Sequence, residues 1–384
     1  MRIDADWLHA PGPRAVMAML RDAGHQALFV GGTVRNALLG HPPGDIDIAT
    51  DAVPERVMEL AEAAGLRPVP TGLDHGTITV VVAHHEGIEV TTFRRDVETD
   101  GRRAVVAFST HVEDDAARRD FTMNALYASA EGEVIDPLGG LPDLRARRVR
   151  FVGNAAERIR EDYLRILRFF RFHAHYGDPG GGLDPEGLAA CAANLAGIET
   201  LSKERIGAEM KKLLAAPDPA PSVAAMAQVG ALARALPGAD HRPLAAIVHL
   251  AHEAGLEPET IRRLAALGGE HPAEALKLSR AEAKRLAALR EGAASGVGAA
   301  ELGYRLGAEA GLSAILLRTA LTGSAPPPDA SAEVERGAAE VFPVKPADLM
   351  PALEGPALGA RLKELEARWI ASGFSLGRDE LLSA

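Results

Sequence analysis

The chain has one cysteine, Cys191, among its 384 residues. An internal disulfide requires two cysteines and a thiolate zinc site requires more, so the sequence excludes both. We therefore expect no disulfide-linked partner and a reducing, cytoplasmic compartment. In its alanine-rich helical surroundings Cys191 is expected to be a small core residue.

Long apolar runs are also missing. No run is long enough for a transmembrane helix, and the N-terminus lacks the basic and then apolar pattern of a signal peptide. The content of 47% apolar and 25% charged residues is typical of a soluble globular protein without a membrane partner. The length is sufficient for two to four domains.

The net charge of −11 argues at first against a nucleic-acid partner. Between Arg145 and Arg171, however, nine arginines stand against three acids, a local balance of +6. We call this segment the arginine stripe. A basic segment on an acidic protein favours local contact with phosphates, although a solvated helix face would have the same composition.

Two regions of different composition follow each other along the chain. Strand-like runs of branched apolar residues occur only in the first region, over 27–30, 45–48, 77–82, 88–93 and 133–137. After Gly139-Gly140 alanine, leucine, arginine and glutamate dominate, a pattern typical of helices. The fold class is therefore predicted as α+β, with a small mixed α/β head followed by an all-helical portion.

Short sequence patterns also predict individual helices, turns and loops. We expect an N-terminal helix within residues 1–26, a helix from Val53 to Ala64, a hairpin turn at His84–Gly87, a mobile polar loop over Asp96–Arg103, a loop at 177–182, a linker at 215–221, a further break at 322–328, and an amphipathic helix from Gly355 to Ile370.

The segment from Ala27 to Thr50 holds the first group of chemically capable residues. A short apolar strand leads into Gly31-Gly32, a helix carrying Arg35 follows, and then come Asp45 and Asp47. In a strand, aspartates two apart point to one face, where they repel each other unless a cation lies between them. Glycine turns at helix starts hold phosphates. The segment therefore suggests a site for a metal-bound nucleoside triphosphate.

A second group is Arg118, Arg119 and Asp120, with Asn124 one helical turn further on. The arginines could form a surface ion pair of little consequence. At the start of a helix they could instead hold a triphosphate or a ribose.

A third group lies in the helical segment from Glu161 to Arg171. Asp162, Arg165, Arg168 and Arg171 recur every three residues and so share one side of a helix. A salt-bridged outer face would show the same spacing. Adenine and cytosine each present an amino donor beside a ring-nitrogen acceptor, and uracil and guanine present the reverse. A carboxylate and a guanidinium together therefore match A and C and oppose U and G.

These groups resemble motifs of the class II tRNA nucleotidyltransferase and poly(A) polymerase family, within the DNA polymerase β-like superfamily. The matching pieces cover residues 27–214 in the family's order, and they are GGTVRN…DIDIAT, HGTITV…IEVTTFRR, RRDFTMNALY, IDPLGGLPDLRARRVRFVG, EDYLRILRFFRF and SKERIGAEMKKLL. The resemblance implies a head (1–138), a helical neck with the base-reading helix (139–214), an RNA-binding body (215–322) and a tRNA-binding tail (323–384).

The resemblance also implies an activity, which is the template-independent addition of C, C and A to the 3′ end of tRNA from CTP and ATP. It implies Mg²⁺ held by the catalytic pair Asp45 and Asp47, with Glu89 as a possible third carboxylate. The nucleotide-binding residues that it implies are Gly31, Gly32, Arg35, Arg118, Arg119, Asp162, Arg165, Arg168 and Arg171. Asp162 and Arg165 are the implied base-reading pair.

Two positions depart from the family pattern. Asn36 stands where aspartate is usual, which removes a charge beside the arginine but no metal ligand. Tyr163 replaces the usual proline after Glu-Asp, which changes how the helix begins. The motifs leave open a poly(A) polymerase or an enzyme that adds only CC or only A. The alternative of another class is an RNA-binding module without catalysis.

Overall fold

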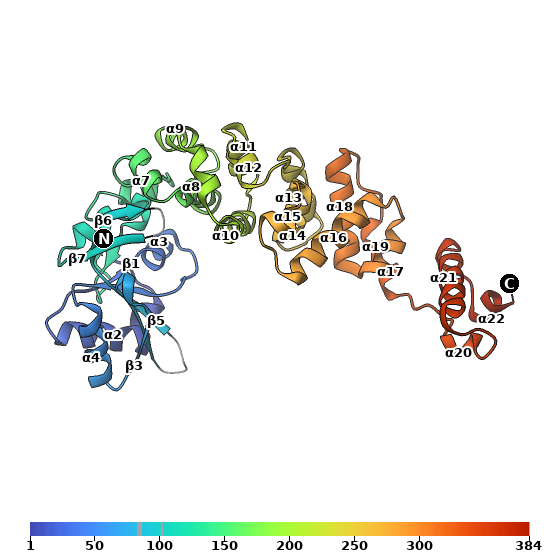
Figure 1. Cartoon of the computed structure of the whole chain (residues 1–384), viewed down its shortest axis with the longest axis horizontal. Helices are drawn as coiled ribbons and strands as arrows, with labels where there is room; N and C mark the ends of the chain where they lie inside the picture. The colour runs from blue at the N-terminus through green and yellow to red at the C-terminus, as the bar shows by residue number, and fades with distance from the viewer. Residues whose placement is uncertain (83–86, 101–102, 384) are drawn as a thin grey trace. The chain divides into compact units, whose positions relative to one another are not determined.

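The structure, a computed structural model, describes residues 1–82, 87–100 and 103–383 (Figure 1). The chain divides into two compact units, Met1–Ala235 and Leu236–Ala384. In the described residues all strands belong to the first unit. The predicted α+β class is confirmed.

A seven-stranded sheet forms the head of the first unit. Its strands are β1 (Ala27–Val30), β2 (Asp47–Thr50), β3 (Arg67–Gly72), β4 (Thr77–Val81), β5 (Gly87–Thr92), β8 (Tyr127–Ala128) and β9 (Val134–Ile135), in the order β3-β4-β5-β2-β1-β8-β9. β2 and β5 run parallel, whereas the other neighbours are antiparallel. The predicted strands are confirmed, although β2 begins two residues later than expected.

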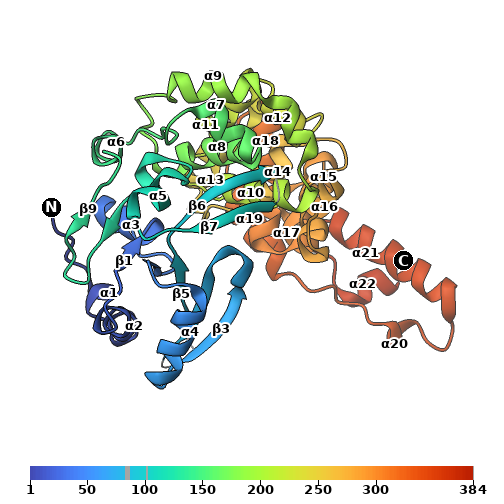
Figure 2. The ribbon, with the colours of Figure 1, turned by 60° about the vertical axis from the view of Figure 1, so that its left-hand side comes forward.

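Two helices cover one face of this sheet, α2 (Pro11–Asp22) and α4 (Pro54–Ala63) (Figure 2). The alternating strands β4 and β5 each bury every second side chain, as half-buried strands do. The predicted N-terminal helix is α2, and a separate short helix, α1 (Asp6–His9), precedes it. α4 agrees with the predicted helix from Val53 to Ala64.

The expectation of a loop over Asp96–Arg103 is wrong for the described residues. β6 (Arg94–Asp100) and β7 (Arg103–Phe108) pair antiparallel as a separate two-stranded ribbon, seen edge to edge in Figure 2. Backbone pairing between the strands has overridden the polar composition. The expected turn at His84–Gly87 lies outside the described residues up to Glu86, and Gly87 begins β5.

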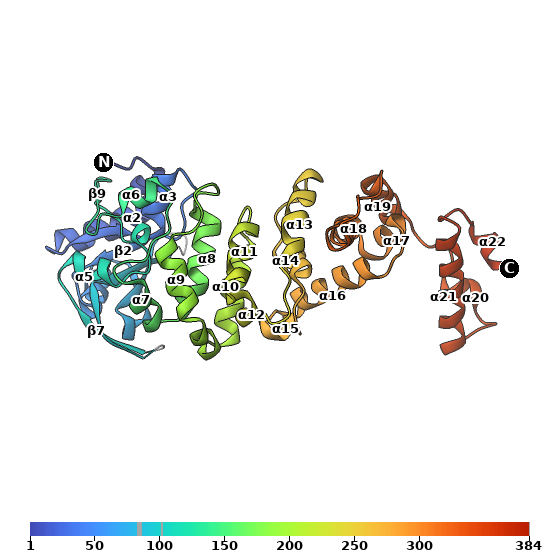
Figure 3. The ribbon, with the colours of Figure 1, turned by 90° about the horizontal axis from the view of Figure 1, so that it is seen from above.

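Short helices complete the first unit (Figure 3). They are α3 (Gly32–Leu39), η1 (Leu73–His75), α5 (Val112–Ala117), η3 (Thr122–Asn124), α6 (Leu141–Arg145), α7 (Ala155–Glu161), α8 (Leu164–Tyr176), α9 (Pro185–Ala193), η4 (Leu195–Thr200), α10 (Lys203–Leu214), α11 (Ala220–Gln228) and α12 (Ala231–Ala235). The segment 177–182 is a loop, as predicted.

The second unit is helical throughout its described residues, 236–383. Its helices are α13 (Arg242–Glu253), α14 (Thr260–Leu267), α15 (Pro272–Ala275), α16 (Arg280–Ala294), α17 (Ala299–Leu306), α18 (Ala308–Thr322), α19 (Ala330–Ala339), α20 (Pro346–Leu349), α21 (Gly355–Ala371) and α22 (Arg378–Leu382). α18 packs against α13, α14, α16, α17 and α19, and is buried on most sides as a result.

α21 confirms the helix expected from Gly355, and Trp369 on it joins an apolar cluster with Val344, Leu365 and Leu381. α17 packs closely on α19, so helices from both sides of the break at 322–328 contact each other. The division of the chain into head, neck, body and tail stays a prediction. Among the described residues, no helix has both the length and the apolar character needed to cross a bilayer.

Candidate active site

The turn between β1 and α3 begins the site. Gly31 has φ +70°, a backbone conformation that favours glycine, and its N–H donates to the Leu126 carbonyl at 3.1 Å. A Cβ on Gly31 would lie 3.3 Å from Nη1 of Arg119. The glycine thus lets the guanidinium of Arg119 approach the N-terminal end of α3. The first N–H groups of a helix are free to hold an anion.

Asp45 and Asp47 lie differently from the expectation of one shared strand. β2 begins at Asp47, and Asp45 is an exposed residue of the preceding segment. Hydroxyl Oγ1 of Thr33 on α3 donates to the backbone carbonyl of Asp45 at 2.5 Å. A side-chain bond to α3 therefore fixes this segment where strand pairing was expected.

Asp47 faces a second carboxylate across the parallel strands. The register of β2 on β5 pairs Asp47 with Glu89, so the two side chains lie on the same face of the sheet. Burial, and then the negative charge of Glu89, raise the pKa of Asp47 to about 6. Carboxylates that repel each other in this way fit a divalent cation, because the cation would remove the repulsion.

The metal would still need other ligands. No group of three His, Cys, Asp or Glu side chains in the described part of the chain is arranged to hold a metal ion by itself. Phosphate oxygens of a bound nucleotide would complete such a shell, as is usual for Mg²⁺.

Arg118 and Arg119 share one buried carboxylate, Asp115, at the end of α5. Arg118 donates to it through Nε at 2.8 Å and Nη2 at 2.6 Å, and Arg119 through Nη2 at 2.8 Å. Burial opposes ionisation of Asp115, but Arg119 and Arg118 outweigh it and hold its pKa at about 2. Because two cations share one anion, the cluster keeps a net positive charge.

Arg35 is only 6% exposed, and its partners are neutral. Its Nη1 donates to Oδ1 of Asn124 at 2.5 Å, while Nε and Nη2 donate to Oδ1 of Asn36 at 3.2 and 2.9 Å. Among the described residues no carboxylate lies within ion-pair distance of Arg35. Burial lowers the pKa of Arg35 accordingly. Asn36, which replaces the usual aspartate, therefore supplies hydrogen bonds without neutralising the charge.

The helix expected over Glu161–Arg171 is broken at Asp162. α7 ends at Glu161, Asp162 has extended backbone (φ −155°, ψ 106°), and α8 begins at Leu164. The carboxylate of Asp162 accepts from the Leu164 N–H at 3.1 Å and from Nη2 of Arg205 at 2.7 Å. Asp162 therefore precedes α8 instead of lying on it, and Arg205 of α10 is its ion-pair partner.

Tyr163 packs against a position that only glycine can occupy. A Cβ on Gly197 would lie 1.9 Å from Cδ1 of the Tyr163 ring. The ring of Tyr163 thus docks the start of α8 on η4. That tyrosine in place of the usual proline changes how α8 begins stays a prediction.

Arg165 is oriented by two backbone carbonyls and by Glu161. Its Nη1 donates to the Arg158 carbonyl at 2.7 Å and also to Glu161, and its Nη2 donates to the Arg118 carbonyl at 3.3 Å. Five N–H groups belong to a guanidinium, so donors of Arg165 remain for a ligand. The two halves of the predicted base-reading pair are each oriented by other residues.

Arg168 and Arg171, further along α8, each pair with a buried acid. Arg168 donates to Asp120 through Nε at 2.8 Å and Nη2 at 2.5 Å, and Arg171 donates to Glu209 through Nε at 2.6 Å. Burial opposes the ionisation of Asp120, but Arg168 and the hydrogen bond from Asn124 lower its pKa below the usual range. As expected, Asn124 lies beside Asp120, with Nδ2 and Oδ1 2.9 Å apart.

A cavity of about 490 Å³ gathers most of these groups. The residues that line it are Gly31, Gly32, Arg35, Asp47, Arg118, Arg119, Asp120, Asn124, Asp162, Leu164, Arg165, Arg168, Phe172 and Arg205. Of the predicted site residues, only Asp45 and Arg171 are outside this lining. Six arginines against three aspartates make it electropositive, which suits a polyanion beside a metal.

The lining includes residues that sequence reasoning did not assign to the site, namely Asp120, Asn124, Leu164, Phe172 and Arg205. Asp120 and Asn124 lie in a motif that had been singled out, so a signal existed for them. Arg205 lies in the matching piece SKERIGAEMKKLL, but no local pattern predicts its approach to Asp162, because that depends on how α10 packs on α8.

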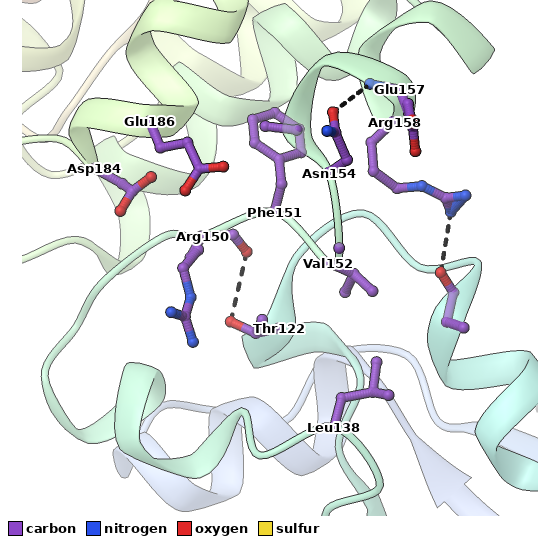
Figure 4. A pocket seen from close by; sticks show the side chains of 13 residues that line it. Thr122, Leu138, Arg150, Phe151, Val152, Asn154, Glu157, Arg158, Asp184 and Glu186 are labelled. Atoms are coloured by element: carbon purple, nitrogen blue, oxygen red, sulfur yellow. Dashed lines mark hydrogen bonds between the residues drawn. The ribbon is translucent and has the colours of Figure 1, made fainter.

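A second cavity, of about 500 Å³, lies between the segment 150–158 and the start of α9 (Figure 4). Its lining carries Arg150 and Arg158 as well as Asp184 and Glu186, so charges of both signs point into it. Nη1 of Arg158 donates to the Ala117 carbonyl at 3.1 Å, drawn as a dashed line. Because the Arg158 carbonyl accepts from Arg165, this wall supports the first cavity.

The arginine stripe does not form one surface. Its half-buried members, Arg158, Arg165, Arg168 and Arg171, lie among the paired groups described above. Its exposed members are Arg145, Arg147, Arg148, Arg150 and Arg160. These five members face solvent, as contact with a large polyanion requires, and Arg150 among them also pairs with Asp143.

Comparison with known proteins gives two family matches. Residues 27–150 match a family described as "Poly A polymerase head domain", and residues 182–242 match one described as "Probable RNA and SrmB- binding site of polymerase A". The first match contains the glycine turn and Asp47.

Named relatives also match part of the chain. The mitochondrial CCA tRNA nucleotidyltransferase 1 of Homo sapiens is 44% identical over 208 residues, which cover 54% of this chain and 48% of the relative. The CCA-adding enzyme of Bacillus cytotoxicus is 44% identical over 207 residues, covering 53% of this chain and 50% of the relative. The chain thus spans about half the length of the curated relatives that it matches.

Among solved structures, the crystal structure of the Bacillus stearothermophilus CCA-adding enzyme in complex with CTP is similar, with a TM-score of 0.72 and 30% identity. The superposition covers 95% of this chain and 93% of that chain. The similarity therefore extends over both units.

Proposed function

Because this chain belongs to the family of class II tRNA nucleotidyltransferases and poly(A) polymerases, we propose that it adds C, C and A to the 3′ end of tRNA without a template, using CTP and ATP. The observation that supports this most is the 490 Å³ cavity. Its lining brings together the carboxylate of Asp47, several arginines, and the pair Asp162 and Arg165. A metal-bound triphosphate needs the first two features, and selection among bases needs the third.

The phosphate end of the nucleotide would bind around the β1–α3 turn. Backbone N–H groups at the N-terminal end of α3, which begins at Gly32, would bind the triphosphate together with the guanidinium groups of Arg35, Arg118 and Arg119. Asp45 and Asp47 would hold Mg²⁺, which when bound supplies charge neutralisation for the phosphates and activation of the attacking hydroxyl. Glu89, opposite Asp47, is available as a further carboxylate.

The reaction is an in-line displacement on phosphorus. The 3′-hydroxyl of the tRNA forms a bond to the α-phosphorus as the bond to the bridging oxygen of the β-phosphate breaks. Pyrophosphate leaves with the bonding electrons, and the hydroxyl gives up its proton. The arginines hold the phosphates in line with the hydroxyl and stabilise charge on the departing pyrophosphate.

The base would be read at the start of α8. Asp162 would accept from the exocyclic amino group of cytosine or adenine, and Arg165 would donate to the neighbouring ring nitrogen. Arg205 and the Leu164 N–H hold the Asp162 carboxylate in place, and acceptor positions remain on it. Arg168 would line the same pocket, oriented by Asp120, while Arg171 lies outside the lining and is held by Glu209.

The tRNA is the proposed partner. We expect the exposed arginines of the stripe and the helical second unit to contact it mainly through phosphates and shape, so binding should weaken as salt rises. The neck, body and tail boundaries belong to this proposal. A cytoplasmic location is also proposed, and it is supported by the single, buried Cys191.

The test uses purified protein, Mg²⁺ and a tRNA that lacks its last three nucleotides. Products formed with each nucleoside triphosphate alone and with CTP and ATP together are resolved by length and sequenced. We expect C, C from CTP alone, and C, C, A from the mixture. A long A tail from ATP alone would indicate a poly(A) polymerase instead. Products that stop at C, C in the mixture would indicate a partial enzyme, and no product with active control enzyme present would refute catalysis.

A further inference from the structure

Tyr176, the last residue of α8, contacts the buried guanidinium of Arg35 in two ways. Cζ of Arg35 lies 3.8 Å from the centroid of the Tyr176 ring, and Nη2 of Arg35 donates to the Tyr176 hydroxyl at 2.7 Å. The Phe172 ring lies 5.3 Å from the same Cζ. Arg35 comes from the head and Tyr176 from the helix that begins with the base-reading residues, 141 positions away in sequence.

Aromatic contact is a particular way to hold a cation. A ring face attracts a guanidinium without neutralising it, whereas a carboxylate would form an ion pair and compete with an incoming phosphate. Asn36, Asn124 and Tyr176, the hydrogen-bond partners of Arg35, are all neutral. Arg35 is thus kept in one place with its charge intact.

Arg35 is connected to α8 by a second route. Its Nη1 donates to Asn124, Asn124 donates to Asp120, and Asp120 accepts from Arg168 on α8. With the contact to Tyr176, these bonds form a closed loop that joins α3, the η3 region and two positions on α8, Arg168 and Tyr176. The position of α8 therefore fixes the position of Arg35 from two sides.

We propose that Tyr176 is a positioning residue that orients Arg35 toward the triphosphate, which rests on the proposed function of the cavity as a nucleotide site. Tyr176 does not itself line the cavity. It acts through Arg35, so its contribution is to the phosphates that all nucleotides share and not to the choice of base.

The test measures binding to the full chain in Mg²⁺ by calorimetry, with three probes, namely CTP, inorganic triphosphate and cytidine. Tyr176→Leu, which removes ring and hydroxyl, should raise the Kd for CTP and for inorganic triphosphate by the same factor, about tenfold. Tyr176→Phe, which keeps the ring, should raise both by about threefold. The Kd for cytidine should not change.

The control is Tyr304→Phe, which removes a hydroxyl bonded to Glu366 in the second unit and should leave all three constants unchanged. In a chain that already carries Arg35→Met, Tyr176→Leu should have no further effect on CTP binding. An additional loss there, or an equal loss for cytidine, would show that Tyr176 acts on the shape of the pocket and would overturn the proposal. If Tyr176→Phe and Tyr176→Leu both bind CTP as the parent does, the proposal is also wrong. Failure of the parent protein to bind CTP would instead refute the nucleotide site itself.

Discussion

The two ends of the nucleotide cavity differ in how their charges are balanced. At the phosphate end, the carboxylate of Asp47 faces that of Glu89, so two negative charges repel each other. The hydrogen-bond partners of Arg35 are neutral, so its positive charge is not compensated. At the base end, Asp162 pairs with Arg205, Arg168 with Asp120, and further acids hold Arg165 and Arg171.

This difference separates two tasks. A site with uncompensated charge gains much from a ligand that supplies the missing charges, so the phosphate end is suited to affinity and to chemistry. A site whose charges are already paired is rigid before the ligand arrives, so the base end is suited to selection by shape. The predictions below test this division.

The largest effect on nucleotide incorporation is expected at Asp47, which faces Glu89. We predict that Asp47→Asn lowers nucleotide incorporation by about 10³-fold or more, because the metal loses a charged ligand. The free energy of unfolding should stay the same or rise, since a repelling carboxylate is removed. Primer-extension rates and urea unfolding measure the two.

The matched control is Asp51→Asn, just beyond β2, whose carboxylate accepts from the Gln26 N–H at 2.9 Å. It should cost some stability and keep incorporation. Full nucleotide incorporation by Asp47→Asn would refute the role of Asp47 in holding the metal.

The opposite result is expected at the base end. Glu209 is 4% exposed and accepts from Arg171, so Glu209→Ala leaves a half-buried cation unpaired. We predict a loss of about 3 kcal/mol in the free energy of unfolding. Glu186→Ala, on the exposed face of α9, should change it by less than about 0.5 kcal/mol. Equal effects of the two substitutions would contradict a pre-paired base end.

A pH profile of stability examines the phosphate end through the titration of Asp47. The pKa of Asp47 is raised to about 6 in the folded protein from 3.8, so folding disfavours its ionised form. In metal-free protein the free energy of unfolding should therefore fall as pH rises from about 4 to about 6, by at most about 3 kcal/mol, and this penalty stays constant above pH 6. Unfolding curves measured across this range in wild type and Asp47→Asn isolate the contribution, and parallel profiles would count against it.

Selectivity tests the base end directly. Asp162→Ala should lower the preference for CTP over UTP by about 30-fold, since one base-edge contact contributes about 1–3 kcal/mol of discrimination. The Kd for tRNA should change much less. Competition between CTP and UTP in single-nucleotide addition gives the ratio, and an unchanged preference would refute base reading by Asp162.

The smallest effect concerns the departure at position 36. Asn36→Asp places a carboxylate beside Arg35, so the charge at the phosphate end becomes partly compensated. We predict a two- to fivefold higher Kd for CTP, about 0.4–1 kcal/mol, measured by calorimetry. Tighter binding would show that uncompensated charge on Arg35 is not what attracts the triphosphate.

Local sequence patterns predicted several features of this site. The glycine turn and the strand before it follow from apolar runs and backbone freedom at Gly31, and the structure confirms both. The stripe of arginines also predicted where cations gather, although only part of it is exposed. The three-residue spacing predicted one continuous helix, and this prediction failed at Asp162. The residue has extended backbone between α7 and α8, and its side chain accepts from the Leu164 N–H.

Contacts between distant segments could not be predicted in the same way. Arg205 reaches Asp162 across 43 positions, and Arg35 reaches Asn124 across 89. Such pairs depend on how helices and the sheet pack, which periodicity does not report. The ribbon of β6 and β7 is a similar case, because the polar segment forms a strand by pairing with a neighbouring strand.

The parallel pairing of β2 with β5 also has a consequence for how the chain folds. α4, β3 and β4 all lie between these strands in sequence, and β3, β4 and β5 form a meander of local contacts. Local contacts form early and distant ones late, because closing a longer loop costs more entropy. We expect Asp47 to meet Glu89 only after the meander exists, so that the repelling pair is assembled last. Pulse-labelled hydrogen exchange during refolding should then find the β2 amides that face β5 protected after those of β4, and earlier protection of β2 would exclude this order.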